Sequence, residues 1–226
     1  LIGVQKLKAC GTAFAAIRLN GQVVTWGDAR FGGNSSLVQN RLKNVDVIEA
    51  CDGAFAAILQ DKSVVTWGNR VRGGDSSCVQ DQLRNIERIF STSGSFAAIR
   101  GTDGAVITWG GRDTGGDSEA VQGQLIDVQF MAGTSAAFAA VLATGTVVTW
   151  GSPRFGGDCS DVKDQLKGVQ ELYASSGAFA AILHTGEVVT WGDKSRGADS
   201  SSVKMLLKDI QYISSSSAAF VAVKSD

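Results

Sequence analysis

The chain has 226 residues, of which 44% are apolar and 19% charged, proportions that are ordinary for a soluble globular protein. Its 21 basic and 22 acidic residues nearly cancel, so the composition gives no reason to expect binding to nucleic acid or anionic lipid. No apolar run approaches the ~18 residues of a membrane-spanning helix, and we expect no transmembrane segment, although peripheral association with a membrane complex is compatible with this composition.

Tryptophan spacing defines an internal repeat. All five tryptophans stand in a Thr-Trp-Gly triplet, and they follow one another at 41, 42, 41 and 41 residues. A fixed period of this length is typical of solenoids and propellers, in which each unit buries its apolar face against its neighbours. We therefore expect a single repeat domain over residues 1–226, with units at 3–44, 45–85, 86–127, 128–168 and 169–209 and a partial unit at 210–226.

The first segment of the second unit shows a strand pattern. Val45, Val47 and Ala50 are separated from one another by polar residues that include Asp46 and Glu49. Alternation with a period of two predicts a half-buried β-strand.

Two short apolar segments follow, Phe55–Leu59 and Val64–Trp67. Asp61-Lys62 lies between them, and the other units have Asn-Gly, Asp-Gly or Thr-Gly at this place. Such pairs between apolar runs predict a β-hairpin with a type I′ turn, in which both central residues have positive φ. We expect these segments to form an antiparallel pair.

The stretch from Ser76 to Leu83 has a helical pattern. Val79 and Leu83 are four residues apart, as the equivalent valine and leucine are in the other units, and Ser or Asp precedes them where an N-cap would lie. This predicts a helix of one to two turns that packs its valine and leucine onto the strands and is too short to be stable alone. Each unit is then three antiparallel strands and a short helical turn, and the all-β chain holds five full repeats and a half.

Aromatic residues mark the structural core of the repeat. A phenylalanine opens the second strand in six copies, and a tryptophan closes the third strand in five. We expect the tryptophans to wedge between neighbouring units, with each indole N–H bound to a nearby carbonyl. These core positions are Phe14, Phe55, Phe96, Phe138, Phe179 and Phe220, and Trp26, Trp67, Trp109, Trp150 and Trp191.

The combined pattern Val-x-x-Ile-x-Ala, Phe-Ala-Ala-Ile, Gly-x-Val-Val-Thr-Trp-Gly and Gly-Gly resembles the repeat of the regulator of chromosome condensation (RCC1) superfamily. It looks most like the compact branch of that superfamily, which includes a β-lactamase inhibitor protein with three-stranded blades. The resemblance covers essentially the whole chain and implies a β-propeller, as a closed or a partial ring. Ala54-Phe55 stands where the superfamily has Gly-His, and Gly-Gly-Asp-Ser stands where it has Gly-Gln.

The number of repeats in this chain differs from the number of blades that the superfamily usually has. The superfamily usually has seven blades, and 226 residues provide fewer units of this length. The chain also begins with Leu1 rather than Met, so we expect a processed or partial product, or a ring with a non-standard closure.

Four variable residues lie between Trp-Gly and the Gly-Gly or Gly-Ala pair in every full unit, and each set contains at least one arginine. In a propeller or solenoid these loops share one face, and arginine and aromatic side chains are favoured at protein interfaces. The alternative is a solvated loop whose arginine pairs with the aspartate that follows. The candidate partner-binding residues are Arg30, Phe31, Arg70, Arg72, Arg112, Arg154, Phe155, Lys194 and Arg196.

An aspartate follows Gly-Gly or Gly-Ala in four units, at Asp75, Asp117, Asp158 and Asp199, and Asn34 takes this place in the first unit. A single carboxylate per turn lacks the dense oxygen ligands of a calcium site. An Asx turn or a helix N-cap explains the position better, and we expect no metal.

Two of the four cysteines, Cys10 and Cys51, share a column that Thr or Ser fills in the other units. We interpret this column as a position for a small residue. A disulfide between the two would need Cα atoms within about 7 Å, and the sequence leaves that pairing open. Cys78 and Cys159 fall in variable loops.

Catalytic groups are few. His184 is the only histidine and lies in an expected hairpin turn, so neither a Ser-His-Asp triad nor a multi-histidine metal site can be assembled. No phosphate-binding loop is present. We expect no enzyme activity and no cofactor.

The hypothesis that these observations favour is a protein-interaction scaffold that presents variable loops, as an accessory or linker subunit of a larger assembly. Two alternatives come from the resemblance: a guanine-nucleotide exchange factor for a small GTPase, and the substrate-recognition propeller of a larger ubiquitin ligase. Exchange activity in the superfamily uses an inserted wedge, whereas the spacing here varies by one residue. The compartment stays open between cytoplasm, nucleus and an organelle.

Overall fold

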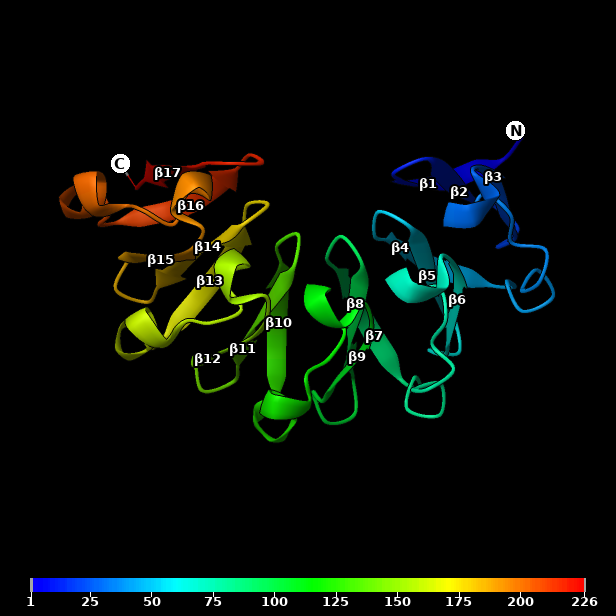
Figure 1. Cartoon of the computed structure of the whole chain (residues 1–226), viewed down its shortest axis with the longest axis horizontal. Helices are drawn as coiled ribbons and strands as arrows, with labels where there is room; N and C mark the ends of the chain where they lie inside the picture. Colours follow the sequence, from blue (N-terminus) through cyan, green and yellow to red (C-terminus); the bar gives the residue numbers. More distant parts are fainter. Residues whose placement is uncertain (1, 226) are drawn as a thin grey trace. The chain divides into compact units, whose positions relative to one another are not determined.

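The computed structural model describes residues 2–225, and most of the regular structure within them is β-strand (Figure 1). These strands form five three-stranded antiparallel sheets and one two-stranded sheet, one sheet for each copy of the repeat. In each three-stranded sheet the strands pair in chain order, so the phenylalanine strand is central. The all-β class and the three antiparallel strands of each full repeat are confirmed.

The chain divides into two compact units, one up to Asp117 and one from Ser118 onward. The first unit contains three sheets of three strands each. Their strands are β1 (Val4–Cys10), β2 (Ala13–Arg18) and β3 (Val23–Gly27), β4 (Val45–Ala50), β5 (Ala54–Leu59) and β6 (Val64–Gly68), and β7 (Ile86–Ser91), β8 (Ser95–Arg100) and β9 (Val106–Gly110).

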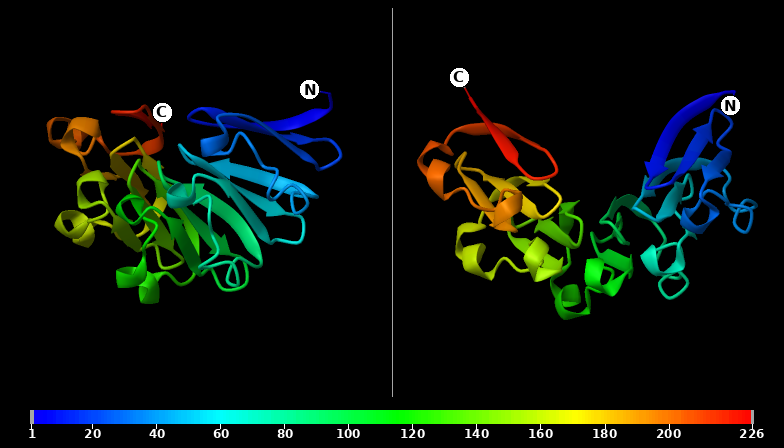
Figure 2. Two further views of the ribbon diagram at one scale, coloured as in Figure 1. Left: turned by 45° about the vertical axis from the view of Figure 1, so that its right-hand side comes forward. Right: turned by 45° about the horizontal axis from the view of Figure 1, so that its top comes forward.

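The second unit contains two three-stranded sheets and the two-stranded one. Their strands are β10 (Val128–Gly133), β11 (Ala137–Leu142) and β12 (Val147–Gly151), β13 (Val169–Ala174), β14 (Ala178–Leu183) and β15 (Val188–Gly192), and β16 (Ile210–Ser215) and β17 (Phe220–Lys224). The β16–β17 sheet lies against the β13–β15 sheet, as both views of Figure 2 show.

A β-bulge near the start of the first strand interrupts the expected alternation in every sheet. In the second sheet Val45 pairs with Leu59 and Val47 pairs with Ile58, so Asp46 is the extra residue. The strand therefore buries Val45 and Ile48, three residues apart, and leaves Val47 half-buried. The prediction of a strand is confirmed, but the strict period of two was wrong because the bulge adds a residue.

The turns between the second and third strands are not of type I′. In the first sheet Gly21 N–H donates to Arg18 O, and Arg18 N–H donates to Gln22 O, each at 2.8 Å. Gly21 has a φ of 73°, whereas Asn20 does not have positive φ. This is a three-residue loop, a type I turn followed by one left-handed residue. The hairpin is confirmed, but the turn type was wrong because the Asn-Gly pair fills the last two places of a longer loop.

The helical stretch after Gly-Gly is a 3-10 helix or an isolated turn. In the second repeat Val79 N–H donates to Ser76 O and Gln82 N–H donates to Val79 O, both three residues back. Of the two residue types expected as the N-cap, serine was wrong at Ser76, whose hydroxyl bonds instead to Thr66 of β6 at 2.9 Å. Asp75 accepts from the backbone N–H of Ser77 at 2.9 Å, at the start of this stretch. Regular 3-10 helices occupy this stretch in η4 (Glu119–Gln124), η6 (Ser160–Gln165) and η8 (Ser201–Leu206).

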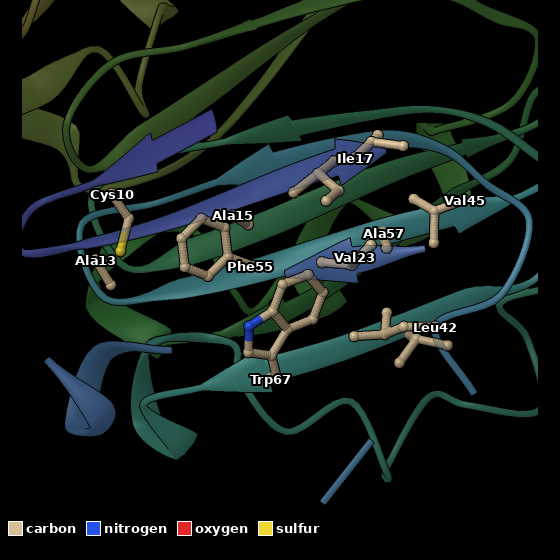
Figure 3. Packing of buried hydrophobic residues seen from close by; sticks show 12 residues of the cluster. Cys10, Ala13, Ala15, Ile17, Val23, Leu42, Val45, Phe55, Ala57 and Trp67 are labelled. Carbon is tan, nitrogen blue, oxygen red and sulfur yellow. The ribbon is translucent and has the colours of Figure 1, made fainter. Parts of the chain in front are cut away.

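Each core lies between consecutive sheets of a unit. Between the first two sheets, Phe55 and Trp67 face Ala15, Ile17 and their neighbours (Figure 3). The next residues along the same strands face the third sheet. In the five three-stranded sheets the alanines that flank the phenylalanine are fully buried, and their small side chains let the sheets approach closely. Burial of a phenylalanine or leucine here contributes about 1.5–3 kcal/mol each.

Candidate partner-binding loops

The loops rest on a pair of stacked aromatic rings in each full repeat. Phe55 lies opposite Trp67 in the strand register, and their ring centroids are 5.1 Å apart with planes inclined by 16°. The same stacking recurs in all five three-stranded sheets, with centroid distances of 5.1–5.4 Å. Such pairs add about 0.5–1.5 kcal/mol beyond the area that they bury. At the outer sheet of the first unit, Phe14 is 38% exposed.

Three of the indoles then hold the loop of the preceding repeat in the same unit. Trp67 Nε1 donates to Gly32 O at 3.0 Å, and Trp109 Nε1 donates to Gly73 O at 3.0 Å. In the second unit Trp191 Nε1 donates to Gly156 O at 3.1 Å. The accepting residue is in every case the glycine that ends the variable loop. A tryptophan is therefore a core residue and also an anchor for a loop.

That closing glycine is required by its conformation and its neighbours. Gly73 has a φ of 91°, and a Cβ placed there would lie 2.6 Å from Phe96 Cδ2. A residue other than glycine does not readily adopt this backbone conformation, and its side chain would not fit in the space beside the ring.

The column that contains Cys10 and Cys51 has a definite role in this arrangement. Cys51 Sγ donates to the carbonyl of Arg72, the last residue of its own loop, at 3.1 Å. The other units place a thiol or hydroxyl in the same position, and each donates to the last loop carbonyl. These contacts are Cys10 to Phe31 at 3.2 Å, Thr92 to Thr114 at 2.8 Å, Thr134 to Phe155 at 3.0 Å and Ser175 to Arg196 at 2.7 Å. The small-residue interpretation of this column missed its hydrogen-bonding function, which the shared donor chemistry of Cys, Thr and Ser could have indicated.

Between the two anchors each loop is a single 3-10 turn. Asp28, Asn69 and Asp193 accept a hydrogen bond from the backbone N–H two residues on, which fixes the start of their turns. The loops that end at Gly32, Gly73 and Gly156 are thus held at both ends, and the outward side chains differ from repeat to repeat in all five loops. The turns are η1 (Ala29–Phe31), η2 (Arg70–Arg72) and η3 (Arg112–Thr114) in the first unit, and η5 (Pro153–Phe155) and η7 (Lys194–Arg196) in the second.

The predicted arginines project into solvent from these turns. The side chains of Arg30, Arg70, Arg112 and Arg154 are 76–85% exposed. Each pairs with an aspartate, and the partners are Asp28 at 2.7 Å, Asp75 at 2.7 Å, Asp117 at 2.9 Å and Asp193 at 3.4 Å. Surface ion pairs of this kind contribute about 0–1 kcal/mol, so a partner with its own carboxylates could replace the intramolecular contact at small cost.

The remaining candidates differ in exposure. Phe31 and Phe155 are half-buried against the cores, and the neighbouring guanidinium carbons of Arg30 and Arg154 lie 5.6 and 5.7 Å from the ring centroids. The other three are Arg72 and Lys194, both exposed, and Arg196, which is half-buried and donates to Ser176 Oγ at 2.5 Å.

Local hydrogen bonds hold the loop aspartates in their charged form. The Arg30 side chain lowers the pKa of Asp28 by hydrogen bonding, and the backbone N–H of Arg30 adds to this effect. For Asp75 the backbone N–H of Ser77 is the largest cause of a lowered pKa, with Arg70 a smaller one. The arginine–aspartate pairs of the loops are therefore fully charged at neutral pH.

The aspartate column forms Asx turns. Asp75 Oδ1 accepts from Ser77 N–H at 2.9 Å, and Asp158, Asp199 and Asn34 make the same contact. No group of three or more His, Cys, Asp or Glu side chains within residues 2–225 is placed to hold a metal ion. His184 is exposed at a hairpin, with its ring beside Gly168. Cys10 and Cys51 are both buried free thiols, so they do not pair.

Repeated three-stranded antiparallel sheets of this kind are the blades of a β-propeller fold. Comparison with solved structures shows which type of propeller repeat the chain has. The chain is similar to yeast RCC1 (Prp20) in its crystal structure bound to Kap60, with a TM-score of 0.61, 16% identity and coverage of 98% of this chain and 68% of that one. It is also similar to Prp20p from Saccharomyces cerevisiae, in a structure described with its binding to Gsp1p and histones (TM-score 0.58, 18% identity, 85% and 58% covered). A third similar structure is the ectodomain of the Physcomitrella patens receptor kinase CR4 (TM-score 0.59, 12% identity, 95% and 56% covered).

The chain has an RCC1-like repeat fold, as its sequence pattern implies. It spans between about half and three quarters of the length of these similar structures. No protein-family model and no curated protein sequence matches it. Among residues 2–225 there is no helix with the length and apolar character needed to cross a membrane.

Proposed function

We propose that this chain is a non-enzymatic protein-interaction module whose partner binds the 3-10 turns after the tryptophan strands. The observation that carries the proposal is the contrast between frame and loop. Every full repeat has the same pair of stacked rings and a turn that ends in the same glycine, yet no two turns have the same four residues. A partner that recognises this chain specifically would contact the side chains that vary between the turns, because the repeated frame is the same in every copy.

Chemistry supports a protein as the partner. Exposed guanidinium groups next to aromatic rings can form bidentate bonds to carboxylates and stack on planar groups. The net charge of −1 supplies no broad positive field of the kind that attracts nucleic acid. The yeast RCC1 structures are described with bound or binding proteins, Kap60 and Gsp1p among them, which supports protein recognition as a use of this fold.

The test compares two quadruple variants of the tagged chain in affinity capture from the native source, with bound proteins quantified by mass spectrometry. The first carries Arg30→Glu, Arg70→Glu, Arg112→Glu and Arg154→Glu. The matched control carries Arg41→Glu, Lys43→Glu, Arg84→Glu and Lys167→Glu, four exposed residues that lie outside the turns and give the same change in charge.

We expect the first variant to lose at least nine tenths of a specific partner and the control to retain it, with both unfolding at the same temperature as the parent. Equal loss in both variants would overturn the proposal. Nucleotide release from a small GTPase, measured with the parent chain, addresses the exchange-factor alternative, and we expect no acceleration.

A further inference from the structure

The first repeat departs from the aspartate column in a way that creates a modification motif. Asn34 stands where the other full repeats have aspartate, and Ser35 and Ser36 follow it. Asn-x-Ser, in which the middle residue is not proline, is the acceptor sequence for N-linked glycosylation. Of all the asparagines in the chain, only Asn34 stands in such a sequence.

Both residues that the motif requires lie at the surface of the first unit. Asn34 and Ser36 are exposed, whereas Ser35 between them is buried. The backbone N–H of Ser35 donates to Thr25 Oγ1 of β3 at 3.1 Å. Ser35 therefore holds the segment on the sheet and leaves the asparagine and the second serine on the outside.

The nitrogen of the Asn34 side chain is free to carry a substituent. Asn34 Oδ1 accepts from the backbone N–H of Ser36 at 2.9 Å, so the oxygen fixes the turn. Within residues 2–225, neither Asn34 Nδ2 nor Ser36 Oγ makes a hydrogen bond. A sugar on the nitrogen would thus break no contact of the folded chain.

The first loop also does not need a carboxylate at this position. In the second repeat the column aspartate, Asp75, pairs with Arg70 of its loop at 2.7 Å. In the first repeat Arg30 pairs instead with Asp28, also at 2.7 Å. Asparagine in place of aspartate therefore leaves no loop arginine without a partner.

An exposed leucine follows the motif directly. Leu37 is 95% exposed, the highest value of any large apolar side chain among residues 2–225. A glycan on a surface asparagine is bulky and hydrophilic, so one at Asn34 would shield this side chain from contact with other molecules. The other repeats, which lack the motif, have smaller or polar residues in place of the leucine: Cys78, Ala120, Asp161 and Ser202.

We propose that Asn34 carries an N-linked glycan, which covers Leu37. In the reaction Asn34 Nδ2 forms a bond to the anomeric carbon of an oligosaccharide that is donated by a lipid diphosphate. The bond between that carbon and the phosphate oxygen breaks, the lipid diphosphate leaves with the electron pair, and the amide nitrogen loses one proton to a base of the transferase. The chain accordingly passes through a compartment that contains such a transferase.

This site lies outside the variable turns, since Asn34 follows the two glycines that end the first loop. The inference therefore goes beyond the proposed function and does not depend on it.

The test begins with the chain purified from its native source. Trypsin releases residues 31–41 as one peptide, Phe-Gly-Gly-Asn-Ser-Ser-Leu-Val-Gln-Asn-Arg. A peptide N-glycosidase in heavy-oxygen water converts a glycosylated asparagine into a labelled aspartate, which mass spectrometry locates. We expect the label at Asn34 and not at Asn40. Recovery of this peptide only in its unmodified form would overturn the proposal.

Variants expressed in the same cells separate the motif from the fold. Ser36→Ala removes the hydroxyl and Asn34→Asp restores the residue of the other repeats, and both retain the acceptor and the N–H of the turn. Asp75→Asn is the matched control, because it creates Asn-Ser-Ser in the same turn of the second repeat.

We expect one glycan on the parent, none on Ser36→Ala or Asn34→Asp, and two on Asp75→Asn, with equal melting temperatures after enzymatic removal of the glycans. A glycan at position 75 alone, or none on any form, would overturn the proposal. Removal of the glycan should also raise the fluorescence of the apolar dye bis-ANS with the parent but not with Leu37→Ser. An equal rise with both would show that the glycan does not cover Leu37.

Discussion

The indole N–H of Trp67 donates to the carbonyl of Gly32 at 3.0 Å, and so joins the core of one repeat to the loop of the repeat before it. Both groups are buried from solvent, and loss of the donor would leave the carbonyl without its bond. The stability of the frame and the position of the loop are therefore linked through one hydrogen bond at this boundary, as they are at the boundaries that Trp109 and Trp191 span.

Trp67→Phe tests this link. Phenylalanine keeps an aromatic ring against Phe55 but removes the N–H, so we expect the free energy of unfolding to fall by about 1–3 kcal/mol. Urea unfolding followed by circular dichroism measures the change. Trp26→Phe is the matched control, because Trp26 is only half-buried, and its loss should be smaller. A larger loss for Trp26→Phe would contradict this account.

Gly73→Ala should destabilise the chain by about 1–3 kcal/mol, because the residue has positive φ and its new methyl group would meet the ring of Phe96. Gly123→Ala provides the comparison. No atom lies within 4 Å of a Cβ at Gly123, so alanine there should be neutral or slightly stabilising. Thermal melts of the two variants measure the contrast, and similar melting temperatures would show that Gly73 is not held as described.

The repeat pattern predicted the fold because the packing residues recur in every copy. Phe55, Trp67 and their equivalents form the same stacked pair in five repeats, and this recurrence was enough to predict the class of fold. The turn type and the bulge were not predicted, because both depend on where one extra residue is placed in the backbone. Asn20-Gly21 fits a two-residue and a three-residue loop equally well by composition.

The loops were predicted by their variability, and a bond from the indole N–H to a carbonyl was expected, but the acceptor in the preceding loop and the second anchor were not predicted. The hydrogen bond from Cys51 to the Arg72 carbonyl joins residues 21 positions apart, and its signal in the sequence is the donor chemistry that Cys, Thr and Ser share in this column. The pairing of arginines with aspartates was foreseen in part. Arg70 and Arg112 bind the aspartate that follows, whereas Arg30 binds the preceding one and Arg154 binds Asp193 of the next loop.

Acid should weaken the hairpin that contains Asp103. The hydrogen bond from the Arg100 side chain lowers the pKa of Asp103 to about 2. Since the unfolded pKa is about 3.9, the ionised carboxylate stabilises the fold above that pH, and this contribution is lost as the pH falls from about 4 to about 2. Asp103→Asn and Arg100→Gln should each reduce the drop in melting temperature between pH 5 and pH 2.5. The same drop in both variants as in the parent would contradict the assignment.

Thiol accessibility should separate the four cysteines. Burial raises the pKa of the Cys10 and Cys51 thiols, Cys159 is also buried, and Cys78 is exposed. We expect iodoacetamide at neutral pH to add one group to the folded chain, at Cys78, and four groups in denaturant. Intact-mass spectrometry with peptide mapping checks this, and rapid labelling of Cys51 in the folded chain would show that its contact with the loop opens.

The central claim is that recognition depends on the differences among the turns, which the repeated frame supports. The most direct measurement uses a variant in which residues 28–31, 111–114, 152–155 and 193–196 are all replaced by Asn-Arg-Val-Arg, the sequence of residues 69–72. Its melting temperature and its capture of the partner are compared with those of the parent. We predict a melting temperature within a few degrees of the parent and loss of the partner although every turn keeps an arginine. Full retention of the partner would contradict the claim.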